Sequence, residues 1–305
     1  LFIFLLLFSF ILSRTGFFQN TVRKNIDTEF KGAILYEHAS LRIIPSAGIL
    51  LQNVDFVTPA EIRIKASSLQ IHPRFPKILT GKFEVAKFTI RKPAVVLDIR
   101  ENTRKEEKDY TTKEIIEKTN IALDEFRKEI PGLVCVVKRG NIVIRNNNEE
   151  LTEISKLNLL FALEPEEIRI RIKGEMANMG EISLVGRFSA RNKTLYINNA
   201  SALFGESSVY DCTGQVKFDN DYDAKLNTGK IVLILDDIYR KFSVFENTRQ
   251  IFGPVNNLKG RIVLSSLNLS GPLLKPQNWD IQTRGSVEGV VLGSSAFPGM
   301  IKIAH

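Results

Sequence analysis

The segment Glu166 to Glu175, EEIRIRIKGE, decides the fold, because its side chains alternate strictly in chemistry. Isoleucine stands at positions 168, 170 and 172, and a basic residue stands at positions 169, 171 and 173. Successive side chains of a β-strand point to opposite faces of a sheet, so this segment predicts a strand with one apolar and one charged face. Water solvates the charged face. What covers the three isoleucines is then the central question.

The same alternation recurs from Leu41 onward, in segments separated by Gly, Pro, Asn or Ser. Together these segments predict roughly a dozen or more strands. The connections between them are too short for helical crossovers, so neighbouring strands are expected to run antiparallel.

One segment breaks the period of two. Phe83 and Val85 are out of phase with Phe88 and Ile90, so they cannot all share one face of a regular strand. An extra residue in the strand would restore the phase. We therefore expect a β-bulge or a turn near Ala86.

The chain begins with an apolar, uncharged stretch, LFIFLLLFSFIL. As a helix this stretch would span roughly 18 Å, which is less than the roughly 30 Å of a bilayer's hydrocarbon core. We therefore expect residues 1–13 to be the end of a truncated transmembrane helix; a signal-peptide core has a similar length, but no small-residue cleavage site follows. Arg14, Arg23 and Lys24 come next and would favour the cytoplasmic side, but the other flank is missing, so the orientation stays open.

Helical periodicity appears in three places. An amphipathic juxtamembrane helix is expected over residues 14–32, and a second helix over residues 111–130, opened by the capping box of Thr111 and Glu114. A third is expected near residues 236–252. The apolar stripe of the first helix consists of Phe18, Val22, Ile26 and Phe30.

These elements define the expected organisation of the chain. The membrane segment (1–13) and the juxtamembrane helix (14–32) precede a β-rich body over residues 33–305. That body contains a first sheet segment (33–110), the helix at 111–130 and a continuing sheet (131–305). The sequence stops within an apolar stretch, MIKI, so the protein is expected to continue beyond residue 305.

Composition and motifs disfavour several classes of function. The net charge of +8 comes from 42 basic and 34 acidic residues that are interspersed, which does not indicate nucleic-acid binding. His38, His72 and His305 have no Cys or carboxylate at ligand spacing, so no metal site is expected. The sequence has no nucleophile elbow, phosphate loop or zinc-protease motif. We expect neither enzymatic activity nor a cofactor.

The two cysteines, Cys135 and Cys212, lie in strand-like segments. Buried thiols are the simplest interpretation of such positions. A disulfide between them would also be compatible with an oxidising compartment.

Two interpretations of the apolar face follow from the residues. In a sandwich or a closed barrel, this face is the protein core. In an open trough it would accept an apolar guest, and an acyl chain would gain ~0.8 kcal/mol per buried methylene. The few helices favour the trough, so the expected fold is mainly β: an elongated, twisted antiparallel sheet curled into an open apolar groove, with a few amphipathic helices and an N-terminal transmembrane helix. The expected lining consists of Val54, Phe56, Ile62, Ile64, Leu69, Ile71, Phe83, Val85, Phe88, Ile90, Leu97, Ile99, Ile142, Ile144, Leu157, Leu159, Ile168, Ile170 and Ile172.

The run LTGKFEVAKFTIRKPAVVLDI, Leu79 to Ile99, resembles the N-terminal region of the AsmA family of bacterial envelope proteins. The segments IPGLVCVVKRGNIVIRN and LTEISKLNLLFAL are similar to that family's second block. The charged insert from Glu101 to Tyr110 departs from the family's pattern. The matching positions of the first run carry a glycine, apolar residues in pairs, a proline and another alternating strand: Gly81, Phe83, Val85, Phe88, Ile90, Pro93, Val95 and Leu97.

The resemblance implies a single-pass anchor in the bacterial inner membrane and a body in the periplasm, which would resolve the orientation. It also implies a groove like that of bridge-like lipid-transfer proteins, which carry phospholipids between the inner and outer membranes and support outer-membrane integrity. Phospholipids, the inner membrane and other envelope proteins are the expected partners. Arg14, Arg23 and Lys24 are expected at headgroups or at the membrane surface. The alternative is a non-enzymatic structural or assembly protein whose apolar sheet is covered by partner chains.

Overall fold

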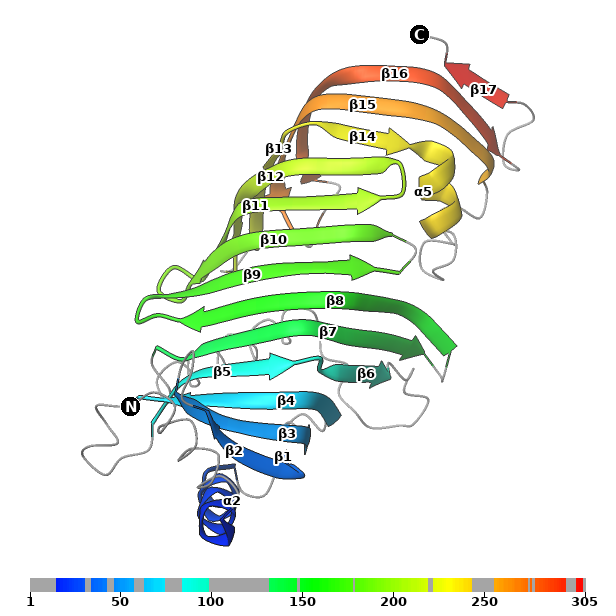
Figure 1. Cartoon of the computed structure of the whole chain (residues 1–305). Coiled ribbons are helices and arrows are strands. Elements are labelled where there is room, and N and C mark those ends of the chain that lie inside the picture. The colour runs from blue at the N-terminus through cyan, green and yellow to red at the C-terminus, as the bar shows by residue number, and fades with distance from the viewer. Residues whose placement is uncertain are drawn as a thin grey trace, which may run out of the picture. The chain divides into compact units, whose positions relative to one another are not determined.

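A computed structural model describes residues 15–30, 34–42, 47–57, 63–74, 84–98, 132–146, 149–177, 179–218, 222–242, 255–273, 275, 278–294 and 300–303. The chain divides into two compact units. Unit 1 comprises residues 1–109 and 122–165, and unit 2 comprises residues 110–121 and 166–305. Within the described residues there are seventeen strands and two short helices, so the protein is mainly β (Figure 1).

Unit 1 is a twisted mixed sheet with one helix packed on it (Figure 1). Strand β3 pairs with β1 and β2 along one edge and with β4 along the other. Strands β5 and β6 together lie between β4 and β7, and β7 pairs with β8. The elements are α2 (Gly16–Phe30), β1 (Ile34–Leu35), β2 (His38–Arg42), β3 (Gly48–Val57), β4 (Arg63–Pro73), β5 (Val85–Arg91), β6 (Ala94–Asp98), β7 (Val134–Asn146) and β8 (Glu149–Leu163).

The expectation of a wholly antiparallel sheet is wrong in unit 1, because β5 and β6 both run parallel to β7. A parallel neighbour requires a connection of a dozen or more residues. Residues 99–133 separate β6 from β7 and provide that length. The charged insert and the predicted helix at 111–130 belong to this connection, and both lie outside the described residues.

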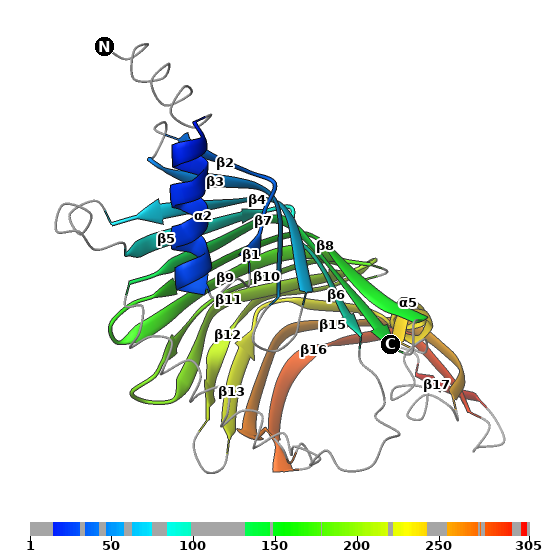
Figure 2. The ribbon, with the colours of Figure 1, turned by 90° about the horizontal axis from the view of Figure 1, so that it is seen from below.

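Unit 2 is an antiparallel meander in which successive strands lie side by side (Figure 1). Strands β13 and β14 share one place, since both pair with β12 on one side and with β15 on the other. Figure 2 shows β15 and β16 as long curved strands. The elements are β9 (Glu167–Met176), β10 (Gly180–Ser189), β11 (Thr194–Phe204), β12 (Ser207–Lys217), β13 (Asp223–Thr228), β14 (Ile231–Ile234), α5 (Leu235–Phe242), β15 (Val255–Pro272), β16 (Asp280–Ser294) and β17 (Met300–Ile303).

Helix α2 falls within the range 14–32 assigned from the sequence, and it covers the apolar face of unit 1 near β1, β2 and β3. Val22 and Ile26 of its stripe are buried in one cluster with Leu51, Leu69 and Ile71. Leu51 and Ile71 are fully buried, at 0% exposure. This part of the apolar face is therefore an ordinary protein core.

Helix α2 also binds the edge of the sheet through Gln19. The Gln19 side-chain amide donates to the Ala39 carbonyl, and its side-chain oxygen accepts from the Ala39 N–H at 3.2 Å. Ala39 lies in β2, whose outer backbone groups would otherwise be open to another strand. Satisfying them with a side chain is one way to prevent edge-to-edge association.

A transverse row of irregular residues crosses unit 1, and we call it the bulge row: Asn53, Ser67, Lys92, Arg139 and Lys156. All except Ser67 have a positive φ, between 48° and 54°. The row is joined by hydrogen bonds: Ser67 Oγ donates to the Arg91 carbonyl (2.9 Å), and the Lys92 N–H donates to the Lys138 carbonyl (2.8 Å). Along each of these strands, successive residues of the buried or apolar face are normally two positions apart, but across the row they are three positions apart.

The step of three is the same in every strand that crosses the row. It runs from 51 to 54 in β3, 66 to 69 in β4, 137 to 140 in β7 and 154 to 157 in β8. Between β5 and β6 it runs from Ile90 to the buried Pro93. Because all strands change phase at one row, apolar side chains stay on one face on both sides of it.

The predicted irregularity near Ala86 is confirmed. His72 pairs with Lys87 and Pro73 pairs with Val85, so Ala86 is the extra residue of a bulge in β5. The bulge returns Val85 to the face that carries Phe88. Both side chains pack against the buried cluster under α2.

The remaining helical expectations concern the N-terminus and α5. Helix α5 covers Leu235–Phe242 and overlaps the start of the region expected near 236–252; residues 243–254 lie outside the described part. In the part of the chain that the structure describes, no helix combines the length and apolarity needed to cross a membrane. The expected membrane segment, residues 1–13, is not in that part.

Arg139 tests the role of the bulge row in stability. We expect Arg139→Val to lower the free energy of unfolding by about 1–2 kcal/mol, because positive φ is costly for a β-branched residue. Arg139→Gly should leave stability unchanged or raise it slightly, since glycine adopts this conformation without steric cost. Urea unfolding followed by circular dichroism measures both. Equal destabilisation by the two substitutions would contradict a backbone role.

Candidate functional site

The apolar face of unit 2 is assembled by strand register. Ile170 lies opposite Gly186, and the pairing continues through Ile197, Gly214, Leu226 and Leu269 to Ile281. This row crosses seven strands, β9 to β13, β15 and β16, without a polar residue. We call it the Ile170 row. It is the central feature of the candidate site.

The adjacent residues form a row of opposite chemistry on the other face. Starting at Arg169, directly paired residues run through Arg187, Tyr196, Gln215, Lys225 and Ser270 to Asp280. This row has no aliphatic member. Along these two rows the faces of unit 2 therefore differ completely in chemistry, as the alternation in EEIRIRIKGE predicted.

Ionic and cation–π contacts stabilise the charged face. Arg187 Nη1 lies 3.0 Å from Glu167 Oε2, and its guanidinium lies 4.8 Å from the centre of the Tyr196 ring. Lys173 and Glu181 pair at 2.7 Å. These side chains are largely exposed, so each such ion pair contributes little stability.

The Ile170 row is only partly buried. Ile170, Ile197, Leu226 and Leu269 are each partly exposed, and Ile281 is 59% exposed. Large aliphatic side chains of a folded protein normally lie in its interior. Here they form a continuous line that stays accessible.

A second apolar row, two residues away, is covered. Ile168 is 1% exposed, and it lies opposite Phe188, which pairs with Leu195. The rings of Phe188 and Phe218 lie 6.1 Å apart, and those of Phe218 and Tyr222 lie 6.5 Å apart. This aromatic cluster forms a small core at one end of strands β9 to β13.

Gly214 shows why the Ile170 row contains glycine. Its φ is 154°, and a Cβ there would lie 2.1 Å from the Lys225 carbonyl oxygen. Any side chain would collide with the neighbouring strand. The backbones of β12 and β13 therefore approach closely at this point.

In unit 1 the predicted lining residues separate into covered and accessible groups. Val54, Leu69 and Ile71 are buried in the cluster under α2, and Phe56, Val85, Phe88 and Ile90 pack against it. Leu157 is also buried, whereas Ile64, Ile142, Ile144 and Leu159 are partly exposed. Leu97 pairs with Ile144. Ile62, Phe83 and Ile99 lie outside the described residues.

The basic residues expected near headgroups lie on or before α2. Arg23 is exposed, and its guanidinium lies 5.9 Å from the centre of the Tyr36 ring. Lys24 is also exposed on the same helix. Arg14 lies outside the described residues.

The predicted lining did not include the strands after β9. Leu184, Ile197, Leu226, Leu269 and Ile281 all share the face of Ile170. The signal was present in the alternation of GEISLVGRFSA and GRIVLSSLNLSG. However, register shifts in β10, β11, β12 and β15 decide which residues align, and they are not readable from alternation alone.

Both cysteines are free thiols on the apolar faces. Cys135 lies opposite Phe88 and Phe161 in unit 1, and Cys212 lies opposite Ala200 in unit 2. Burial raises the pKa of both thiols. No cluster of His, Cys, Asp and Glu among the described residues could hold a metal ion.

No protein-family model matches the chain, and no curated protein sequence matches it.

Thiol labelling tests the placement of the two cysteines. Only the thiolate reacts with a maleimide, and a raised pKa lowers the thiolate fraction at any given pH. The labelling rate of the folded protein should therefore reach its midpoint at a higher pH than that of the urea-unfolded protein. Cys135→Ser and Cys212→Ser assign each midpoint. Identical midpoints in the folded and unfolded states would show that the thiols are not buried.

Proposed function

We propose that this chain is a non-enzymatic lipid-transfer protein that binds phospholipid acyl chains along the apolar face of its sheet. The observation that carries the proposal is the Ile170 row, an uninterrupted apolar line across seven strands that is partly exposed and backed by a fully polar row. In this proposal the body lies in the periplasm, anchored in the inner membrane, and carries phospholipids toward the outer membrane. The resemblance of residues 79–99 to the AsmA family supports this setting.

The energetics favour an acyl chain as the occupant. Soluble proteins rarely expose large continuous apolar surfaces, and those that do generally use them for binding. At ~0.8 kcal/mol per methylene, covering one long acyl chain yields roughly 10 kcal/mol of transfer free energy. This is close to what the chain loses on leaving a bilayer. A lipid could therefore pass between membrane and protein without a large free-energy difference.

The shape of the apolar face suits a guest that slides. The side chains of the Ile170 row are aliphatic, with glycine at Gly186 and Gly214, so no polar group of this row fixes a ligand at one position. A site that must hold one ligand usually places a few polar groups precisely. A uniform apolar line instead gives similar contacts to an acyl chain at successive positions.

Helix α2 limits where acyl chains could lie in unit 1. It fills the apolar face over Leu51, Leu69 and Ile71 with protein. In unit 1 the residues left for contact with acyl chains are therefore the partly exposed Ile142, Ile144 and Leu159 of β7 and β8. In unit 2 the contact residues are those of the Ile170 row.

Two substitutions in β9 distinguish an accessible lipid-binding surface at Ile170 from a closed protein core. Ile170→Asp should leave the protein folded, because Ile170 is partly exposed, but it should lower the amount of co-purifying phospholipid several-fold, since a carboxylate beside an acyl chain is poorly solvated. Ile168→Asp should instead unfold the protein, because Ile168 is fully covered. Mass spectrometry of lipid extracts and circular dichroism measure the two effects.

The matched control is Arg171→Gln, which also lowers the net charge by one but lies on the exposed basic face of the same strand. It should retain lipid at the wild-type level. Wild-type protein without phospholipid would reject the proposal. A photo-crosslinker at position 170 that captures only protein chains would favour the alternative, an assembly protein whose apolar face is covered by partners.

A further inference from the structure

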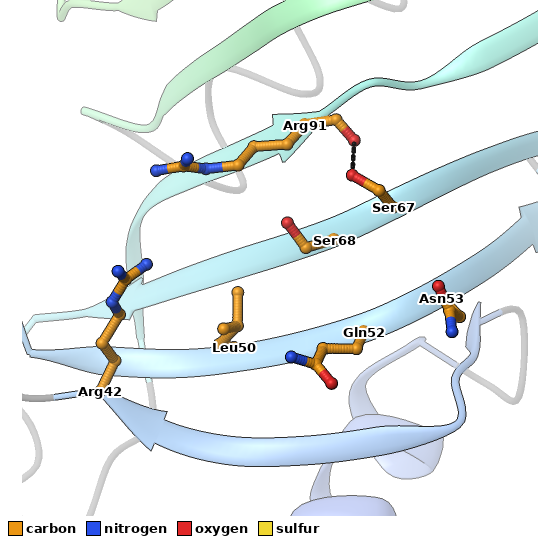
Figure 3. A pocket seen from close by; sticks show the side chains of 7 residues that line it. All are labelled: Arg42, Leu50, Gln52, Asn53, Ser67, Ser68 and Arg91. Atoms are coloured by element: carbon orange, nitrogen blue, oxygen red, sulfur yellow. Dashed lines mark hydrogen bonds between the residues drawn. The ribbon is translucent and has the colours of Figure 1, made fainter.

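A pocket lies on the polar face of unit 1, over strands β2 to β5 (Figure 3). Its volume is about 330 Å³, which is within the range of small-molecule sites. The two arginine side chains come from β2 and β5, at opposite sides of the pocket. The lining residues are Arg42, Leu50, Gln52, Asn53, Ser67, Ser68 and Arg91.

The pocket and the apolar face are on opposite sides of the same strands. Leu50 pairs with Gln70 and Ser68 pairs with Arg91, whereas the intervening Leu51 and Leu69 point into the core under α2. An acyl chain on the apolar face cannot reach this pocket through the sheet. A ligand of the pocket is therefore separate from the proposed acyl-chain path.

The two arginines of the pocket carry charge that no described carboxylate balances. Neither Arg42 nor Arg91 forms an ion pair in the described part of the chain. Arg91 also lies directly beside Lys138 across the parallel β5–β7 pair. Like charges at paired positions repel, so a bound anion would relieve this repulsion.

The acidic side chains of the same region are already engaged. Asn53 Nδ2 donates to Glu37 Oε2, and Arg63 binds the Asp55 carboxylate through Nε and Nη2. The hydrogen bond from Arg63 lowers the pKa of Asp55, so this carboxylate stays ionised and paired. The positive charge of Arg42 and Arg91 is left for a ligand.

The remaining groups of the pocket suit a phosphate group. Guanidinium groups bind phosphate oxygens through two parallel N–H donors. The Ser68 hydroxyl and the Gln52 amide are neutral donors in the lining of the same pocket (Figure 3). Ser67 Oγ donates to the Arg91 carbonyl, which fixes the strand that presents the Arg91 side chain. Leu50 adds an apolar side chain to the lining.

We propose that this pocket binds a phosphate group on a small organic moiety, such as a glycerophosphate. Two sources share this chemistry: the headgroup of an anionic phospholipid and a water-soluble phosphate ester. The pocket recognises the phosphate with Arg42 and Arg91, and its volume accommodates the attached polar group.

The test uses the full chain in detergent micelles. Isothermal calorimetry measures binding of glycerol 3-phosphate and inorganic phosphate, and native mass spectrometry measures retention of phosphatidylglycerol against phosphatidylcholine added to the micelles. Arg42→Gln and Arg91→Gln should each weaken binding by about tenfold, as expected for the loss of a charge-assisted hydrogen bond. Arg91→Lys should fall between wild type and Arg91→Gln, because it keeps the charge but loses the paired donors.

The matched control is Arg284→Gln in β16. Arg284 is also exposed, and its carbonyl accepts a hydrogen bond from Ser265 Oγ, as that of Arg91 does from Ser67. The same loss of charge there should leave binding unchanged. If the soluble phosphates bind, and Arg42→Gln and Arg91→Gln but not Arg284→Gln weaken that binding, the ligand is a soluble phosphate ester. If only phosphatidylglycerol is selectively retained, the ligand is a lipid headgroup.

Two results would overturn the inference. One is the absence of binding of both soluble phosphates to folded wild-type protein, together with equal retention of phosphatidylglycerol and phosphatidylcholine. The other is equal weakening by Arg91→Gln and Arg284→Gln, which would show that anions follow the net charge and not the pocket. Neither result depends on acyl-chain binding, because Ile170→Asp leaves the pocket intact.

Discussion

The structure depends on one constraint: residues paired across a β-ladder must point to the same face. Hydrogen bonding fixes the pairing, and alternation then fixes the face of every other residue in both strands. A slip of one residue in any strand would turn its apolar side chains toward water. The bulge row of unit 1 shows the constraint acting collectively, because β3, β4, β7 and β8 and the break between β5 and β6 all change phase together. An isolated bulge in one strand would separate its apolar face from that of its neighbours.

The residues that accept positive φ at the bulge row are mostly long and charged. Lys92, Arg139 and Lys156 stand where glycine or asparagine would be less strained. All three side chains are exposed, so the bends add charge to the polar surface. The strain and the charge have different roles: the backbone keeps the apolar face continuous, and the side chains keep the opposite face solvated.

Much of this architecture follows from the sequence, and the reasons for the rest are physical. Alternation in EEIRIRIKGE predicts β9 and both of its faces, and the phase change around Ala86 predicts the bulge in β5. The parallel β5–β7 pair does not follow from the sequence, because a charged insert followed by a helix does not by itself reveal that the connection over residues 99–133 is a crossover. The phosphate pocket was not predictable, since Arg42, Gln52, Ser68 and Arg91 meet only through the register of four strands.

Alternation also does not tell what covers an apolar face, and the two units show this directly. Leu51 and Ile170 both belong to regular apolar alternation, but Leu51 lies under α2 and is fully buried, whereas Ile170 remains accessible. Within β9 itself, the aromatic cluster at the strand end covers Ile168. Ile170, two residues further along the same face, stays partly exposed. The identity of the occupant is therefore set by elements distant in sequence, such as Val22 and Ile26 of α2. In unit 2 the aromatic cluster covers one end of the face, and the aliphatic row beside it is the surface on which a non-protein chain could complete the burial.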